Sequence, residues 1–257
     1  MARSWKEAQR QELAFWRRIY VENRPDIATY RPVTSDAAIA FTEKTLIRFG
    51  DSLESLHALT VADVGCGPYG LIKGFQVFSE RSGLAPAMIY GIDPLMEDYR
   101  RFGIIADDPN IRLIGGMGER IPLEPGSCDR VYSVNSLDHV ENPPAVVAEC
   151  WRLVKPGGAL NVSLHVVRPP LSMMRRWLKY VDTNHPFHFS KGDVRRMLAH
   201  VCGGIACERS VPVLIDQPEY ALSEFFKDPG LRALRRWAAT FTLEIYFARC
   251  VKGDVCA

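Results

Sequence analysis

The stretch ADVGCGPYG, residues 62–70, is the strongest indication of the fold in this sequence. Gly65, Gly67 and Gly70 have the spacing GxGxxG, and they follow an apolar run that begins at Leu59. Glycines at this spacing permit a tight turn and let a helix or a ligand approach the backbone closely. The pattern predicts a buried strand, a ligand-binding turn and the start of a helix, in that order.

Short apolar runs alternate with helical patterns from about residue 60 onward. The runs that predict strands are residues 59–65, 87–93, 111–116, 129–135 and 158–167. Strands that alternate with helices are typical of a parallel sheet covered by helices on both faces. We therefore expect an α/β fold, a Rossmann-like three-layer sandwich around a twisted, mostly parallel sheet of seven strands.

The last third of the chain supplies the remaining two strands. Its patterns predict helices near residues 169–181, after Ser190 and near residues 220–238, a strand around residues 206–215 and a final strand near the C-terminus. Ser190 and Asp193 have the spacing of a capping box, which marks a helix start. Apolar residues alternate along residues 241–247, which gives the final strand one apolar face. We expect this strand to join the sheet antiparallel to the others.

Two amphipathic helical patterns precede the first strand. Leu13, Trp16 and Tyr20 are spaced for one face of a helix, and a second pattern follows residues 34–36. No linker rich in Gly, Ser or Pro marks a boundary between independent domains. We expect a helical cap at residues 1–58 and one domain at residues 59–257, with an insertion at about residues 168–190 on the side of the substrate.

Composition disfavours several classes of protein. The chain has 257 residues, of which 47% are hydrophobic and 24% charged, as in an ordinary globular protein. No run reaches the roughly 18 apolar residues of a membrane helix, and the N-terminal residues are polar, so we expect a cytoplasmic protein without a membrane partner. A net charge of +2 disfavours nucleic acid as a partner. The seven cysteines lack metal-type spacing and are expected to be free thiols.

Two acidic residues indicate what the glycine-rich turn binds. Asp93 ends the second predicted strand, where its carboxylate can accept hydrogen bonds from both hydroxyls of a ribose. Asp63 lies two positions before the first glycine, where a dinucleotide-binding fold normally has an apolar residue. Because a carboxylate repels a pyrophosphate, Asp63 favours a nucleoside that carries a cationic amino group and a sulfonium.

These residues resemble the class I S-adenosylmethionine-dependent methyltransferases, in their small-molecule, methyltransferase type 11-like branch. The resemblance covers about residues 60–165 and extends more loosely to the C-terminus. The matching parts are Asp63, Gly65, Cys66, Gly67 and Gly70 of the glycine-rich motif, Asp93, and residues 118–123, 126–131, 133–140 and 153–158. The chain departs from the family before Gly118, where relatives commonly have an Asp that binds adenine. Met117 stands there and accepts hydrogen bonds poorly.

The resemblance implies methyl transfer from S-adenosylmethionine to an oxygen, nitrogen or carbon nucleophile of a small organic molecule, with S-adenosylhomocysteine as the other product. The methyl group of a sulfonium is already activated, so in-line displacement requires positioning, exclusion of water and often a base, but no metal ion. The acceptor stays open, and so does the choice between a monomer and a homodimer.

Two other functions are compatible with parts of the pattern. A nicotinamide-dependent dehydrogenase uses the same glycine spacing, but Asp63 and the turn at residues 155–158 disfavour it. A non-catalytic S-adenosylmethionine-binding partner or regulatory protein on the same fold is favoured by Met117 and disfavoured by the intact Asp63 and Asp93.

The resemblance also assigns candidate site residues. Those expected at the cofactor are Asp63, Gly65, Cys66, Gly67, Gly70, Asp93, Pro94, Met117, Gly118, Glu119, Asn135 and Tyr20. Tyr20 and Tyr30 belong to the N-terminal aromatics, which could form a lid and for which helix packing is the alternative. Tyr30 is also expected to contact the substrate.

Histidines provide the candidates for catalysis. His139 is the first candidate base because its segment lies beside the methyl group in relatives, although it could instead bind backbone at a helix start. His185 is the second candidate, and Phe187 and His188 are expected to line the substrate pocket with it. A metal site that adds His165 is conceivable from residue type alone, but no spacing selects it.

Overall fold

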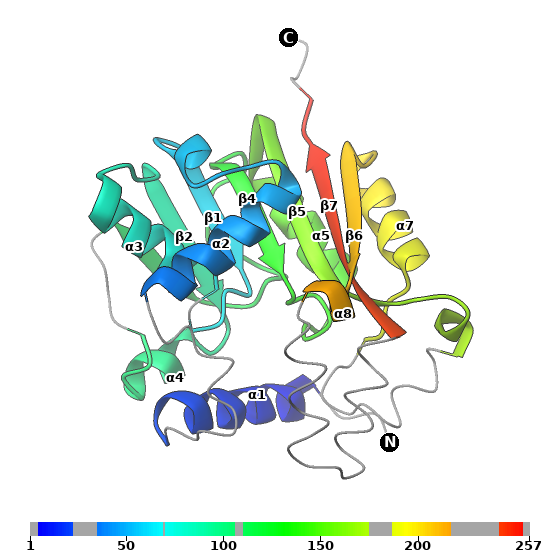
Figure 1. The fold of residues 1–257 in the computed structure, drawn as a ribbon, viewed down its shortest axis with the longest axis horizontal. Helices are drawn as coiled ribbons and strands as arrows, with labels where there is room; N and C mark the ends of the chain where they lie inside the picture. Colours follow the sequence, from blue (N-terminus) through cyan, green and yellow to red (C-terminus); the bar gives the residue numbers. More distant parts are fainter. Residues whose placement is uncertain are drawn as a thin grey trace.

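A computed structural model describes residues 5–22, 35–68, 70–105, 110–174, 187–216 and 242–253. Its centre is a sheet of seven strands in the order β3-β2-β1-β4-β5-β7-β6 (Figure 1). The strands are β1 Thr60–Val64, β2 Met88–Asp93, β3 Ile111–Gly115, β4 Cys128–Val134, β5 Val154–Val167, β6 Cys207–Pro212 and β7 Leu243–Val251. Strands β1 to β5 pair in parallel, and β7 runs antiparallel to both β5 and β6. The predicted α/β fold with an antiparallel last strand is confirmed.

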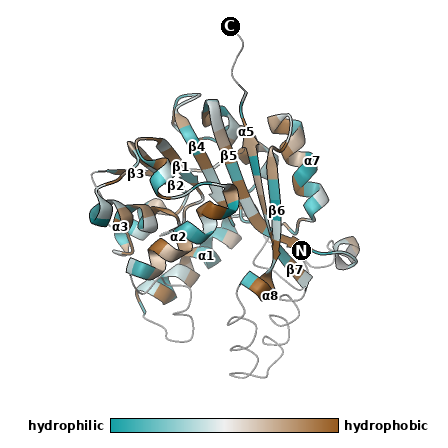
Figure 2. Cartoon of the chain, turned by 45° about the horizontal axis from the view of Figure 1, so that its top comes forward, coloured by the Kyte–Doolittle hydropathy of each residue, from teal (hydrophilic) through white to brown (hydrophobic). Residues whose placement is uncertain are grey.

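Helices cover both faces of the sheet and complete three layers. They are α1 Trp5–Tyr20, α2 Ser35–Phe49, α3 Ile72–Ser82, α4 Met96–Arg101, α5 Pro143–Leu153, α7 Lys191–Cys202 and α8 Val213–Asp216, with 3-10 turns η2 Glu54–Leu56 and η3 Leu171–Met174. Helices α2 and α3 lie on one face, and α5 and α7 lie on the other. Figure 2 shows the hydrophobic residues along the central strands, between these two layers.

Two apolar cores hold the layers together. One lies beneath α5 and α7 and includes Val147, Leu160 and Leu198. The other lies beneath α2 and α3 and includes Leu46 and Phe75. Burial of a side chain of this size stabilises the fold by about 1.5–3 kcal/mol, so each face of the sheet is a substantial source of stability.

The helix ends follow local sequence signals. Helix α7 begins with the predicted capping box, in which the Ser190 side chain accepts from the Asp193 backbone N–H and the Asp193 carboxylate accepts from the Ser190 N–H. Helix α5 begins after Asn142, whose side chain accepts from the Ala145 N–H at 3.2 Å. These caps place the loops before α5 and α7 at defined positions along the sheet.

Two predicted elements differ from the structure. The strand expected at residues 206–215 ends at Pro212, and α8 follows, where Asp216 pairs with Arg48 and Lys44 of α2. These ion pairs explain why the chain leaves the sheet edge. Where a helix is expected at residues 169–181, the described start is the short 3-10 turn η3, in which the Met173 N–H donates to Pro170 O at 3.2 Å. Residues 175–186 and the helix expected at residues 220–238 lie outside the described residues.

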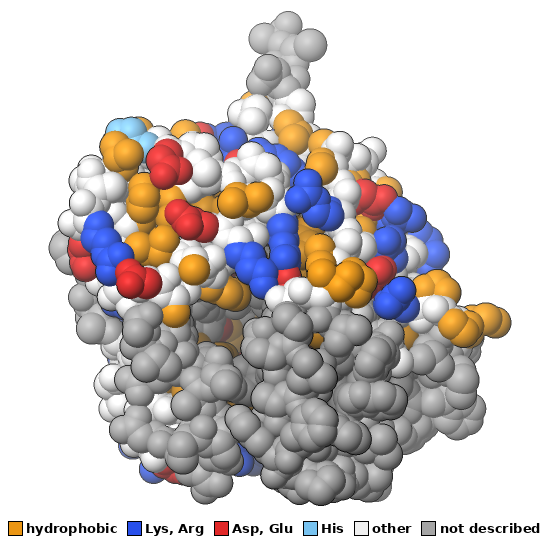
Figure 3. Space-filling view, in the orientation of Figure 1, with side chains coloured by type: hydrophobic (Ala, Val, Ile, Leu, Met, Phe, Trp, Pro, Cys, Tyr) orange, Lys and Arg blue, Asp and Glu red, His pale blue; other side chains and the backbone are white. Residues whose placement is uncertain are grey.

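Helix α1 lies across the carboxyl ends of the parallel strands, below the sheet in Figure 1. The described side chains of both charge signs are interspersed on the face drawn in Figure 3. Across the described ranges, no helix combines the length and the apolar character needed to cross a membrane. Open α/β sheets bind their ligands at the carboxyl edge, which is the edge that α1 covers here.

Candidate functional site

The glycine-rich turn after β1 is tightly packed and requires its glycines. Gly65 and Gly70 have φ of 73° and 36°, in the left-handed region that favours glycine. A Cβ at Gly65 would lie 2.4 Å from the Ser136 Cβ, and a Cβ at Gly70 would lie 2.6 Å from the Asp63 Oδ2. The turn therefore rests directly on the segment that follows β4.

Two buried carboxylates flank this turn. Asp63 Oδ2 accepts a hydrogen bond from the Leu71 N–H at 3.0 Å, and burial raises the pKa of Asp63 to about 7. Asp93 accepts from the Gly67 N–H and the Leu95 N–H, both at 2.9 Å, and burial raises its pKa to about 6. Neither carboxylate forms an ion pair with a Lys or Arg among the described residues. Backbone hydrogen bonds alone therefore leave both carboxylates undercompensated.

This arrangement suits a ligand with a cation and vicinal hydroxyl groups. Each carboxylate oxygen has about two acceptor positions, and the backbone hydrogen bonds described above use one position on Asp63 and two on Asp93. A Cβ at Gly67 would meet only the Trp16 ring, at 3.9 Å, so Trp16 is the one side chain that lies over this part of the turn among the described residues. Donors and a positive charge would satisfy the remaining positions.

Helix α1 closes the site from outside the sheet. The Trp16 ring faces Gly67, and its indole N–H donates to Glu12 Oε1 at 2.7 Å. The Tyr20 ring stacks on Trp16 with 5.9 Å between ring centroids. These contacts place Tyr20 next to Trp16, and its role at the cofactor stays a prediction.

His139 lies at the same edge, in the loop between β4 and α5. Its Nδ1 is 3.7 Å from Glu12 Oε2, and its Nε2 is 3.9 Å from Asp138 Oδ1, both longer than a hydrogen bond. Its charge and that of Glu12 act with opposite sign on the pKa of Asp93, which places all three groups around one site. Helix α5 is capped by Asn142, so His139 does not mark the helix start.

Asn135, directly after β4, has a left-handed backbone conformation. Its φ is 52°, in a region that asparagine adopts more readily than most residues other than glycine. Its backbone N–H donates to Ser163 O at 2.7 Å, and its Oδ1 lies 2.6 Å from His165 Nδ1. The sequence suggests His165 only as a conceivable metal ligand. Its position as a polar residue at the carboxyl end of an apolar strand is the sequence signal that could have marked it as a site residue.

The loop after β3 contains three of the predicted cofactor residues. Glu119 Oε1 accepts from the backbone N–H groups of Glu141 and Asn142, at 3.1 and 2.9 Å, which ties this loop to the start of α5. A Cβ at Gly118 would lie 3.1 Å from Val146 Cγ1, and Met117 is half-buried beside it.

Cys66 and Pro94 lie on opposite sides of the turn region. The Cys66 thiol is buried, packs 3.3 Å from the Cβ position of Gly91 on β2, and has a raised pKa because of that burial. Pro94 follows Asp93 and is exposed. The side chain of Cys66 therefore faces the sheet.

The predicted substrate residues are described only in part. His185 and Tyr30 lie outside the described residues. Phe187 and His188 precede Phe189, whose carbonyl accepts from the Val167 N–H at 2.8 Å. Residues 187–189 therefore lie beside the carboxyl end of β5. In the described ranges, no group of three or more His, Cys, Asp or Glu side chains could hold a metal ion.

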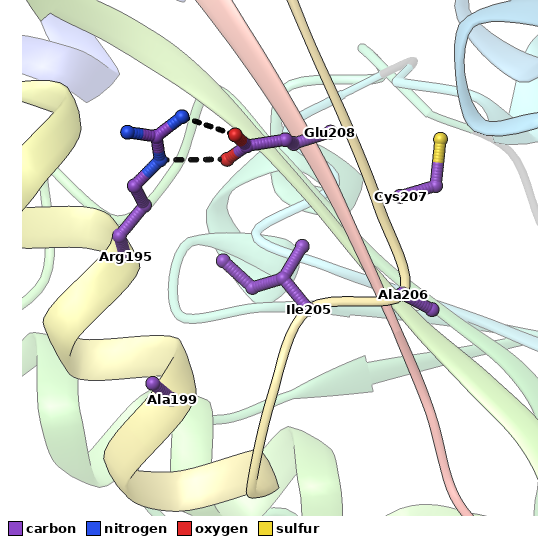
Figure 4. Close-up of a pocket in the computed structure, with 6 residues that line it drawn as sticks. All are labelled: Arg195, Ala199, Ile205, Ala206, Cys207 and Glu208. Atoms are coloured by element: carbon purple, nitrogen blue, oxygen red, sulfur yellow. Dashed lines mark hydrogen bonds and ion pairs between the residues drawn. The ribbon is translucent and has the colours of Figure 1, made fainter.

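A surface pocket lies at the far edge of the sheet, between α7 and β6. Figure 4 shows Arg195 and Glu208 facing each other across it, with Arg195 Nε donating to Glu208 Oε2 at 2.8 Å. The two charged groups form an ion pair with one another, and this pocket is remote from the glycine-rich turn. We therefore assign the site to the carboxyl edge of the sheet.

The central part of the chain matches a family of known sequences. Residues 62–162 match the family model of a methyltransferase domain. The ubiquinone biosynthesis O-methyltransferase of Pseudomonas paraeruginosa is 33% identical over 123 residues, which are 44% of this chain and 47% of that protein. An uncharacterized 37.1 kDa protein in transposon TN4556 of Streptomyces fradiae is 26% identical over 208 residues, 76% of this chain and 57% of that protein. The chain thus spans about half the length of the curated relatives it matches.

Solved structures share the whole architecture at low sequence identity. A geranyl diphosphate methyltransferase in complex with SAM has a TM-score of 0.62 at 16% identity, covering 83% of this chain and 85% of that one. The Haemonchus contortus Phospholethanolamine N-methyltransferase 2, in complex with S-adenosylhomocysteine, has a TM-score of 0.60 at 16% identity, covering 84% and 53%. The [4+2]-cyclase SpnF has a TM-score of 0.57 at 17% identity, covering 86% and 82%. These likenesses confirm the fold.

Proposed function

Because residues 62–162 of this chain match the family model of a methyltransferase domain, we propose that the protein transfers a methyl group from S-adenosylmethionine to a small organic molecule. The observation that carries this proposal is the pair of buried carboxylates on either side of the glycine-rich turn. Asp63 and Asp93 have raised pKa values and no Lys or Arg partner among the described residues. A ligand with an ammonium group and ribose hydroxyls supplies what both carboxylates lack.

The chain's own residues provide the contacts for this cofactor. Asp93 accepts the ribose hydroxyls, and Asp63 faces the positive end of the molecule. The glycines of the turn have no Cβ, so a ligand can approach the backbone closely. Met117 would cover the adenine, and a backbone group in place of the usual Asp would accept from its amino group. S-adenosylmethionine supplies a methyl group that its sulfonium has already activated.

Catalysis then depends on positioning and on a dry site. In-line displacement requires the acceptor nucleophile to be held close to the methyl carbon and opposite the leaving sulfur. Trp16 and Tyr20 of α1 shield the turn from water. His139 lies at this edge and, with His185, is a candidate for removing the proton of the acceptor.

The acceptor is proposed to be a small molecule that binds beside β4 and β5. Residues 1–58 act as a cap and residues 168–190 as an insertion over this side, with Phe187, His188 and Tyr30 as contacts. The name of the 33% identical relatives, O-methyltransferase, favours an oxygen nucleophile over nitrogen or carbon. The likeness covers under half of this chain, so the substrate of those enzymes is not transferred to it.

Calorimetric titration with S-adenosylmethionine, S-adenosylhomocysteine and NADH tests this function. We expect micromolar binding of the two adenosyl ligands and no binding of NADH. Acceptors are then screened by release of S-adenosylhomocysteine from a panel of phenols, carboxylic acids and amines. Binding of NADH alone would contradict the proposal, and binding of the adenosyl ligands without turnover of any acceptor would favour a non-catalytic partner protein.

A further inference from the structure

His165 lies at the carboxyl end of β5, and its Nδ1 is 2.6 Å from Asn135 Oδ1. We propose that His165 is the base that removes the proton of the methyl acceptor, and that Asn135 positions its ring. This inference rests on the proposed methyl transfer, and it assigns a role to a residue for which the sequence offered no motif.

Packed residues connect His165 to the glycine-rich turn. The turn rests on Ser136, whose Cβ lies 2.4 Å from the Cβ position of Gly65, and whose hydroxyl donates to Val64 O at 3.1 Å. Asn135 directly precedes Ser136, and the side chain of Asn135 contacts His165. The strand order reverses between β1 and β4, and open sheets bind ligands in the crevice at such a point. His165 therefore flanks the crevice on the side away from Asp93.

The segment predicted to line the substrate pocket lies at the same place. Val166 forms a parallel bridge with Phe189, and the Val167 N–H donates to Phe189 O at 2.8 Å. Phe187 and His188 precede Phe189 in the chain. The residue next to His165 on β5 is thus paired to this segment, so an acceptor bound there would contact the edge that carries the imidazole.

The hydrogen bond to Asn135 determines which nitrogen can act as a base. An amide oxygen only accepts hydrogen bonds, so Nδ1 of His165 must carry the hydrogen. In the neutral ring the lone pair is then on Nε2, on the opposite side from Asn135. Asn135 has a left-handed φ of 52°, and non-glycine residues in this region cluster at functional sites.

The carboxylates near His139 lie beyond hydrogen-bond distance. Its nearest acidic oxygens are at 3.7 and 3.9 Å, whereas the contact of His165 has the length of a strong hydrogen bond. The hydrogen bond to Asn135, which fixes the tautomer of the ring, favours His165 as the base.

Polar residues continue from His165 into the sheet. Asn161 and Ser163 share its face of β5, and their side chains are 0% and 1% exposed. The Asn161 amide has no hydrogen-bond partner in the described part of the protein. Apolar residues at these positions would pack better, so the alternation of polar side chains is not explained by core formation alone.

The proposed step is balanced in protons and electrons. The nucleophilic atom of the acceptor forms a bond to the methyl carbon while the carbon–sulfur bond breaks, and the bonding pair remains on sulfur. His165 accepts the acceptor's proton at Nε2 and becomes an imidazolium with both ring nitrogens protonated. Water then takes the proton from Nε2 and restores the neutral ring for the next turnover.

Imidazole NMR of the full chain tests the positioning part without any acceptor. Long-range ¹H–¹⁵N spectra of histidine-labelled protein should show the Nδ1–H tautomer at His165, assigned with His165→Asn. Asn135→Gly removes the amide but tolerates the left-handed φ, so the protein should stay folded while His165 changes to mainly the Nε2–H tautomer. Asn135→Asp retains the acceptor and should retain Nδ1–H. His57, whose Nδ1 lies 3.0 Å from Ala85 O, should not change in either variant.

Titration with S-adenosylhomocysteine tests the location. We expect the ring signals of His165 to shift together with the Gly67 amide, while those of His57 stay in place. A shift at Gly67 with none at His165, or an unchanged tautomer in Asn135→Gly, would overturn this inference and leave the proposed function intact. Absence of a shift at Gly67 would overturn the proposed function itself.

The acceptor found by the product-release screen then tests catalysis. His165→Asn should lower kcat about 100-fold with the Kd for S-adenosylhomocysteine within twofold, because a general base contributes roughly 10²–10⁴ to the rate. His139→Asn should lower kcat less. The reverse order of the two variants would assign the base to His139.

Discussion

Binding of S-adenosylmethionine should release about one proton per molecule at pH 6.5. With pKa values of about 7 for Asp63 and about 6 for Asp93, the free protein carries about 0.8 and 0.2 proton on these groups at that pH. A cationic ligand favours both carboxylates in the ionised form, so the protons leave on binding. By linkage, affinity should rise about tenfold from pH 6 to pH 7. The ligand's α-amino group, with a pKa near 7.7–8.0, stays mostly protonated in this range.

Calorimetry in buffers of different ionisation enthalpy measures this release. The slope of the observed binding enthalpy against the buffer ionisation enthalpy equals the number of protons, about one for the unchanged protein. Asp63→Asn should reduce it to about 0.2, because only Asp93 then titrates. Asp129→Asn is the matched control. Lys155 and the Thr60 N–H stabilise the Asp129 carboxylate and lower its pKa, so it is already ionised and the slope should not change. A slope near zero in the unchanged protein would refute the assignment of these carboxylates to the cofactor.

Three further outcomes test other parts of the site. Asp93→Ala should weaken S-adenosylmethionine binding by about 1–3 kcal/mol through loss of charged hydrogen bonds, and an unchanged Kd in calorimetry would remove the proposed placement of the ribose. Gly65→Ala should lower the free energy of unfolding in urea by about 2 kcal/mol more than Gly83→Ala. Both glycines have φ near 72°, but only Gly65 has a side chain, that of Ser136, in the path of the new Cβ, so equal losses would contradict the described packing. The free protein should lose stability as pH rises from 5 to 7.5, since the raised pKa of Asp63 stabilises the fold only while the group is protonated. Thermal unfolding across this range measures the loss, and a Tm that is constant or rises would contradict it.

Much of the site could be predicted from sequence because its parts are local. The glycine spacing of residues 62–70 and the acid at the end of the second strand each depend on a few consecutive residues. Parallel strands bring their carboxyl ends to one edge, so the sequence order alone placed Asp63 near Asp93. The register of β1 and β2, with Asp63 opposite Gly91, agrees with this expectation.

The contacts that close the site could not be predicted in the same way. Glu12 and His139 are 127 positions apart, and Asn135 and His165 are 30 apart. No periodicity specifies such pairs, because they depend on where α1 packs and on the register of β4 with β5. The strand around residues 206–215 was predicted too long for the same reason, since Asp216 leaves the sheet to pair with Arg48.

The sequence by itself determined the class of fold, the order of its motifs and the edge of the sheet at which we propose that a nucleoside binds. These depend on hydrophobic periodicity and on glycine conformation, which act over a few residues. Only the tertiary structure decided that the pKa values of Asp63 and Asp93 are raised and that the Asn135 amide holds His165. Burial and hydrogen-bond geometry are properties of the packed chain, because segments distant in sequence must first exclude water from the same volume.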